Sequence, residues 1–382
     1  MATQASNVTT ALTQKYWDTK LVREIQTTDI FSNYVGPITN HGQLPNQIVA
    51  QKHQKGKTTG TMGFIKSLSG AGVSGLTGLS GSEESMVIRD QTIYANEFKW
   101  GVENTTFGAE AVANSPYGLL GLAGPLLIEY MEKNLGKHRR QSLVEKYSYN
   151  LTGAPSSRTL GLNSNIWVGG VALASQPAYV DTLATYQTAV NTAIPDSPTS
   201  ANRMTAANVK LLEDYTRVSA KLEPFAGGRY IVTVPAGQKS TLMDEDTGLL
   251  KHFSSSSQPE KALKGWIGSY MQFDFVEDLR SPVLLATDGA SSSLTWTYVG
   301  ADDSRPALAT DQWDVGFVLG KGAICELVIE KQHFETDDFT EYGREEKLGA
   351  FADYGCNANE FQDGTDAKIN QGSIVVLWNR NA

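Results

Sequence analysis

The densest group of side chains that could do chemistry is an acidic stretch, EKQHFETDDFTEYGREE, which begins at Glu330. It places one imidazole among several carboxylates: His333, Glu335, Asp337, Asp338, Glu341, Glu345 and Glu346. Clustered carboxylates can bind Ca²⁺ or Mg²⁺, but the spacing here does not match an EF-hand loop, whose glycine and final glutamate occupy fixed positions. The stretch is better explained as a solvated acidic surface or as a charge partner for a basic patch on a neighbouring molecule.

A second candidate is the sequence PAGQKST, which follows the apolar run RYIVTV and has some features of a phosphate-binding loop. Such a loop needs a glycine, a short spacer and then Gly-Lys-Ser/Thr, because successive backbone N–H groups must surround the phosphates. Here Gln238 separates Gly237 from Lys239. The spacing therefore favours a turn that ends a strand over a nucleotide site.

One dense basic patch, KHRR, occurs within a predicted helix. Its candidate charge partners are Lys137, Arg139 and Arg140, which could contact DNA phosphates or the carboxylates of a neighbouring molecule. A solvated helix face is the simpler alternative.

Other catalytic and metal-binding patterns are missing from the sequence. There is no GxSxG motif and no CxxC pair, and the five histidines are dispersed along the chain. The two cysteines, Cys325 and Cys356, are expected to be free thiols. Any two of the 41 acidic residues could still converge as a glycosidase pair. We expect no catalytic residues, no cofactor and no metal site, and therefore no enzyme.

Composition narrows the class of protein further. The formal net charge of −9 argues against a sequence-specific nucleic-acid reader, although not against a protein that encloses nucleic acid. Only 19% of the residues are charged, which suits a subunit with much contacted surface. The sequence contains no window of about 18 consecutive apolar residues, so it predicts no membrane span. The first residues lack the basic and apolar regions of a signal peptide, which predicts assembly in the cytoplasm.

The elements that must position these residues form an α+β pattern. Leu127, Met131 and Leu135 recur at every fourth residue and predict a helix over 124–149, roughly 40 Å long. Thr205 is a good N-cap for a second helix over 205–221, and a short amphipathic helix is expected over 16–27. Apolar and β-branched runs predict strands in these segments: 85–102, 229–234, 291–303, 315–334 and 372–382. The segment 265–280 predicts either a further strand or a helix followed by a strand.

A glycine-rich segment between Lys55 and Glu84 is the most unusual part of the chain. It reads KGKTTGTMGFIKSLSGAGVSGLTGLSGSEE and is flanked by strand-like sequence on both sides. Such a segment cannot bury enough apolar surface to fold by itself. We therefore predict a long arm that is held by something outside its own globular body, most simply a neighbouring copy of the same chain.

This segment resembles the extended loop of tailed-phage major capsid proteins, and in particular the coat-protein family that includes the podovirus N-four type. The family pattern is Leu-x-Gly-x-Gly-Val-x-Gly, then Leu-x-Gly-x-Glu-Glu, then a returning strand. The matching positions are Leu68, Gly70, Gly72, Val73, Gly75, Leu79, Gly81, Glu83 and Glu84. With Phe64 and Ile65, these residues are the candidate inter-subunit contacts. A looser resemblance continues through most of the chain.

The resemblance implies the tailed-phage and herpesvirus capsid fold. Its implied segments are an N-terminal arm (1–50), an extended loop (51–102), a peripheral domain with a spine helix (103–200), an axial domain (201–325), and a return to the peripheral domain with a C-terminal strand (326–382). It also implies a virion protein that forms hexamers and pentamers and encloses double-stranded DNA. Scaffold, portal and decoration proteins are its implied partners. The alternatives are an encapsulin-like compartment shell and a secreted β-rich surface protein or enzyme.

Overall fold

A computed structural model describes somewhat more than half of the residues of the chain. The described residues are 30–31, 34–38, 47–54, 59–65, 88–104, 119–144, 165–177, 189–190, 192–194, 199–225, 227–244, 248–249, 266–286, 294–298, 312–340, 345–362, 368–370 and 372–380. The helix predicted over 16–27 lies outside them.

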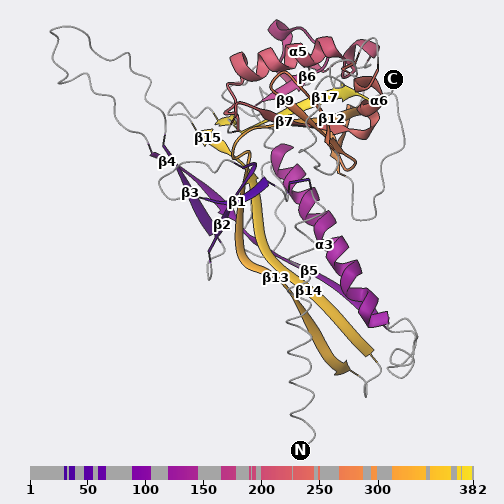
Figure 1. The fold of residues 1–382 in the computed structure, drawn as a ribbon. Helices are drawn as coiled ribbons and strands as arrows, with labels where there is room; N and C mark the ends of the chain where they lie inside the picture. Colours follow the sequence, from indigo (N-terminus) through magenta and orange to yellow (C-terminus); the bar gives the residue numbers. More distant parts are fainter. Residues whose placement is uncertain are drawn as a thin grey trace, which may run out of the picture.

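A five-stranded sheet and one long helix form the elongated part of the molecule (Figure 1). The strand order is β1 (Val35–Pro37), β2 (Val49–His53), β13 (Ile324–Thr340), β14 (Glu345–Ala358) and β5 (Asn96–Asn104). Strands β13 and β14 form a long antiparallel hairpin, and helix α3 (Leu119–Val144) lies along one face of it (Figure 1).

Side-chain alternation in this sheet explains why the helix packs there. Phe98 of β5 and Tyr354 of β14 point towards α3 and join a core that contains Leu127, Met131 and Leu135. The predicted helical repeat of these three residues is thus confirmed as the buried stripe of α3. The intervening strand residues, which include charged side chains, face the other way.

An eight-stranded sheet forms the second body. The order β11-β10-β12-β7-β9-β8 is extended by β17, which pairs with β12 and with β6. The bounds are β6 Ile166–Val168, β7 Tyr230–Pro235, β8 Trp266–Tyr270, β9 Phe273–Asp278, β10 Val283–Ala286, β11 Leu294–Thr297, β12 Gln312–Leu319 and β17 Ser373–Asn379. Every residue of β7, β12 and β17 is buried, because apolar clusters cover the sheet on both faces.

Helix α5 (Ala206–Asp214) covers one face of this sheet through Val209 and Leu212. The predicted N-cap is confirmed, because the Thr205 side chain accepts a hydrogen bond from the backbone N–H of Asn208. After Asp214 the helix widens into a π-helical turn, η4 (Tyr215–Ser219). The other short helices are η2 Leu173–Ser175, η3 Ser200–Asn202, η5 Ala236–Gln238 and α6 Lys239–Leu242.

Two small antiparallel pairs complete the described strands. One is β15 (Glu360–Gln362) with β16 (Lys368–Asn370), and the other is β3 (Thr59–Ile65) with β4 (Ile88–Tyr94). The single strand predicted over 85–102 is therefore two strands, β4 and β5, which meet at Ala95. The two strands belong to different sheets, which sequence alternation alone does not reveal.

The strand pairing bears on two of the implied segments. Strand β17 comes from the segment 326–382 and β6 from 103–200, yet both lie in the sheet that is built mainly from 201–325. The C-terminal strand β17 therefore lies inside the eight-stranded sheet, between β12 and β6, whereas β13 and β14 belong to the five-stranded one.

Candidate functional site at the root of the glycine-rich loop

The glycine-rich loop leaves the body through the ribbon formed by β3 and β4. The two strands pair in continuous antiparallel register from Thr59 opposite Tyr94 to Ile65 opposite Ile88. Residues 66–87 therefore connect two strand ends that lie directly across from each other. We call the β3–β4 pair the loop root.

The loop root packs on the five-stranded sheet through a small apolar cluster of its own. Met62, Ile93 and Ala95 contact Cys325 and Leu327 of β13. Two polar contacts add to it: the Gln91 amide donates to the Ala358 carbonyl at 2.7 Å, and the Lys52 ammonium donates to the Thr61 carbonyl at 2.6 Å. The loop root is therefore fixed to the body.

Close backbone approach makes one glycine essential to this packing. A Cβ added to Gly355 of β14 would lie 2.0 Å from the backbone oxygen of Tyr94 in β4. A Cβ added to Gly60 would instead meet the flexible side chain of Leu327 at 2.6 Å. The contact at Gly355 involves backbone atoms, so it cannot be relieved by a rotamer change.

We expect Gly355→Ala to displace the loop root from β14 and to lower the free energy of unfolding by about 1–3 kcal/mol, the usual range for overpacking. Gly63→Ala is the matched control, because a Cβ on Gly63 of β3 meets nothing within 4 Å. Urea-induced unfolding of both variants compares them directly. Equal stability of the two variants would contradict the close approach.

The candidate contact residues fall mostly beyond the described part of the chain. Phe64 and Ile65 end strand β3, where they pair with Arg89 and Ile88 of β4, and only their backbone is described. The remaining candidates lie between Ile65 and Ile88, outside the described residues: Leu68, Gly70, Gly72, Val73, Gly75, Leu79, Gly81, Glu83 and Glu84. Their role in contacts between subunits stays a prediction.

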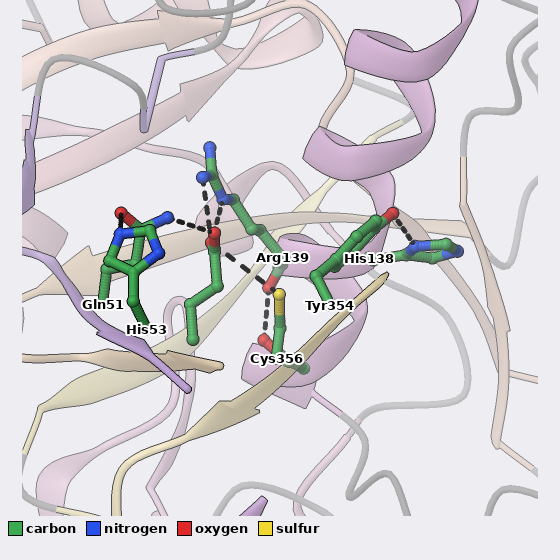
Figure 2. Close-up of polar contacts among 8 residues, drawn as sticks. Gln51, His53, His138, Arg139, Tyr354 and Cys356 are labelled. Atoms are coloured by element: carbon green, nitrogen blue, oxygen red, sulfur yellow. Dashed lines mark hydrogen bonds and ion pairs between the residues drawn. The ribbon is translucent and has the colours of Figure 1, made fainter. Parts of the chain in front are cut away.

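The two arginines of the basic patch of α3 lie neither on a solvated helix face nor on a surface that could contact DNA or a neighbouring molecule. Arg139 is buried and donates through Nε, at 3.0 Å, and Nη2, at 2.9 Å, to the Glu326 carboxylate of β13 (Figure 2). The Gln51 amide donates to the other oxygen of Glu326 at 3.0 Å, and the Cys356 sulfur lies 3.9 Å from the carboxylate. A buried charge needs such partners because its hydration is lost.

Arg140 points to the other body of the molecule. Its guanidinium binds Asp278 of β9 through two hydrogen bonds of 2.8 and 2.7 Å, and the Phe31 ring lies 5.4 Å from its Cζ atom. The prediction that these arginines lie on a solvated helix face, or contact DNA or a neighbouring molecule, is therefore corrected. Each arginine is neutralised by a carboxylate of the same chain, because the helix is buried between two sheets at this point.

The rest of the basic patch lies closer to the surface. His138 is half-buried, and its Nδ1 lies 2.7 Å from the Tyr354 hydroxyl (Figure 2). Lys137 is also half-buried. Glu326 and Asp278 are the functional partners that the sequence did not reveal. Arg140 and Asp278 are 138 positions apart, and only the fold brings them together.

The other chemical candidates are part of the structural framework. PAGQKST continues from β7 into a helical turn, which confirms the predicted strand-ending turn, and the Lys239 ammonium is paired with Glu277 at 2.6 Å. Burial raises the pKa of the Cys325 thiol to about 12, which keeps it protonated and unreactive. Among the described residues, no group of three or more His, Cys, Asp or Glu side chains is arranged to bind a metal.

In the described part of the chain, no helix combines the length and the apolar composition that a bilayer span requires.

Comparison with solved structures identifies the fold. The chain matches the structure titled "Capsid of Ralstonia phage GP4" with a TM-score of 0.64 and 12% identity, over 94% of this chain and 92% of that one. It matches the cyanophage Pam1 capsid asymmetric unit with a TM-score of 0.60 and 14% identity, over 92% of each chain. It matches the head structure of Helicobacter pylori bacteriophage KHP40 with a TM-score of 0.57 and 13% identity, over 88% of each chain.

Sequence comparison gives no such relationship. No protein-family model matches the chain, and no curated protein matches it significantly. The structural matches nevertheless span nearly the whole length of this chain and of the matched chains. The protein therefore has the α+β fold of the tailed-phage major capsid proteins.

Proposed function

We propose that this chain is the major capsid protein of a tailed bacteriophage, and that many copies assemble into the icosahedral shell around packaged double-stranded DNA. The observation that carries the proposal is the near-complete structural match to phage capsid proteins. The loop root supports it, because a ribbon anchored at one end and continued by a glycine-rich loop is suited to contact a neighbouring subunit.

The two sheets correspond to the two bodies of such a subunit. In this proposal the five-stranded sheet with α3 is the peripheral domain, and the eight-stranded sheet with α5 is the axial domain. The glycine-rich loop reaches an adjacent subunit and is ordered there through Phe64, Ile65 and Leu68. Hexamers and pentamers are the expected assemblies, formed in the host cytoplasm, with scaffold, portal and decoration proteins as further partners.

The charge of the protein agrees with a container for DNA that does not bind a specific sequence. A formal net charge of −9 limits adhesion of the packaged genome to the shell wall. Both arginines of α3 are already paired with carboxylates within the chain and do not contribute a DNA-binding surface. No catalytic role is proposed.

Electron microscopy of the purified protein tests the proposal. We expect uniform closed particles, and a preparation that contains only monomers or irregular aggregates under all assembly conditions would contradict it. Particles isolated from producing cells distinguish a virus shell from an encapsulin-like compartment. The virus shell holds nuclease-resistant DNA, whereas the compartment holds cargo protein.

A further inference from the structure

Three carboxylates lie in one row across the exposed face of the five-stranded sheet. The strand register places Glu330 of β13 opposite Asp353 of β14, and Asp353 opposite Glu97 of β5. Their neighbours along β5 and β14, Phe98 and Tyr354, point to the opposite face, towards α3. Like charges directly across from each other destabilise strand pairing. We call these three residues the carboxylate row.

Basic side chains compensate only the ends of the carboxylate row. The Lys99 ammonium lies 2.9 Å from Glu97, and His333 Nδ1 lies 3.9 Å from Glu330. Both bases belong to the next row of the sheet, where they flank the ring of Phe351. Among the described residues, the Asp353 carboxylate forms neither a hydrogen bond nor an ion pair. The central carboxylate therefore faces two like charges without a direct partner.

The environment of Asp353 favours its protonated form. Partial burial raises the pKa of this carboxyl above its ordinary value of 3.8, and Glu97 and Glu330 raise it further. His333 and Lys99 act in the opposite direction. These are the charged groups that face Asp353 from the two strands that flank β14.

The carboxylate row also coincides with two of the three register shifts in the long hairpin. The pairing of β13 with β14 shifts register between Val328 and Glu330, and again between Glu330 and His333. Such irregularities bend a strand and weaken the local ladder. Figure 1 shows β13 and β14 curving together along their length. The least regular pairing in the hairpin is thus located where the like charges meet.

We propose that this bend is a pH-responsive element, in which protonation of Asp353 tightens the pairing of β13 with β14 and ionisation loosens it. The direction of this pH effect follows from the linkage between proton binding and stability. A carboxyl with a raised pKa in the folded state gains stability as the pH falls from above that pKa to the unfolded value of 3.8. Neutral solution therefore leaves the hairpin locally loosened, and mild acid closes it.

Amide hydrogen exchange of the full-length protein tests this element. After correction for the intrinsic exchange rate, protection of amides around 328–334 and 351–354 is expected to rise severalfold between about pH 7.5 and about pH 4. In Asp353→Asn, which is nearly isosteric and uncharged, protection is expected to be high and independent of pH. Amides of the buried strand β12 report on global stability in the same experiment.

Two further variants separate this element from a general effect of charge. Glu97→Gln removes one neighbour and is expected to move the midpoint of the transition to lower pH. Glu223→Gln removes one exposed negative charge that pairs with Lys321 in the other body, and is expected to leave the profile unchanged. The proposal is overturned if Asp353→Asn keeps the pH dependence of the wild type, or if Glu223→Gln alters it as much as Glu97→Gln does.

Discussion

A chain in which residues 66–87 are replaced by an Asn-Gly turn will fold normally but will form no closed particles. The replacement is geometrically simple, because Ile65 and Ile88 are directly paired and a two-residue turn closes such strand ends. The loop root keeps its packing on Cys325 and Leu327, so the body retains its core. What is lost is the segment proposed to bridge to a neighbouring subunit.

Electron microscopy and analytical ultracentrifugation measure the outcome. A second variant keeps the length of the loop but replaces Leu68, Val73 and Leu79 with serine. It separates the need for apolar contacts from the need for reach, and assembly is expected to fall sharply in it as well. Normal particles from the shortened chain would exclude the loop as the link between subunits, while leaving the fold assignment intact.

The second large effect is expected at Arg140. Arg140→Ala leaves the Asp278 carboxylate buried without its bidentate partner, where its side chain is 2% exposed. Breaking a buried ion pair from one side costs about 3–5 kcal/mol of stability, mainly because the remaining charge stays desolvated. We expect this loss in urea-induced unfolding of the unassembled protein, followed by tryptophan fluorescence.

Two controls make the interpretation specific. The double variant Arg140→Met, Asp278→Leu removes both charges and is expected to recover most of the lost stability, because apolar pairs often replace buried ion pairs without penalty. Lys99→Ala breaks an exposed pair and is expected to cost at most about 1 kcal/mol. If Arg140→Ala is as mild as Lys99→Ala, the buried pair contributes little to the fold.

Local features were predictable from the sequence because they depend on neighbours along the chain. The buried stripe of α3, the N-cap at Thr205 and the strands β7 and β17 all follow from spacing and residue type. The long hairpin was foreseen only in part, because the run 315–334 predicts strand over the first half of β13 whereas no strand is predicted over β14. Its register shifts on either side of Glu330 are not marked by any sequence pattern.

The candidate site likewise has features that depend on neighbours along the chain and features that depend on distant contacts. The glycine-rich composition of 66–87 identifies the loop, but the anchoring of its root at Gly355 depends on a contact between distant strands. The KHRR patch shows how a local pattern can mislead. Four basic residues in sequence usually indicate a solvated face, whereas Arg139 and Arg140 meet carboxylates supplied by β13 and β9. Whether these arginines face solvent or form internal ion pairs depends on their burial, which is a property of the whole fold.

The consecutive positions of Arg139 and Arg140 have a mechanical consequence. Successive side chains on an α-helix point about 100° apart, so one turn of α3 holds both sheets through neighbouring residues. Rotation of the helix about its axis cannot release one carboxylate without also straining the other. One turn of α3 therefore joins the two sheets, and two adjacent ion pairs couple the position of one sheet to that of the other.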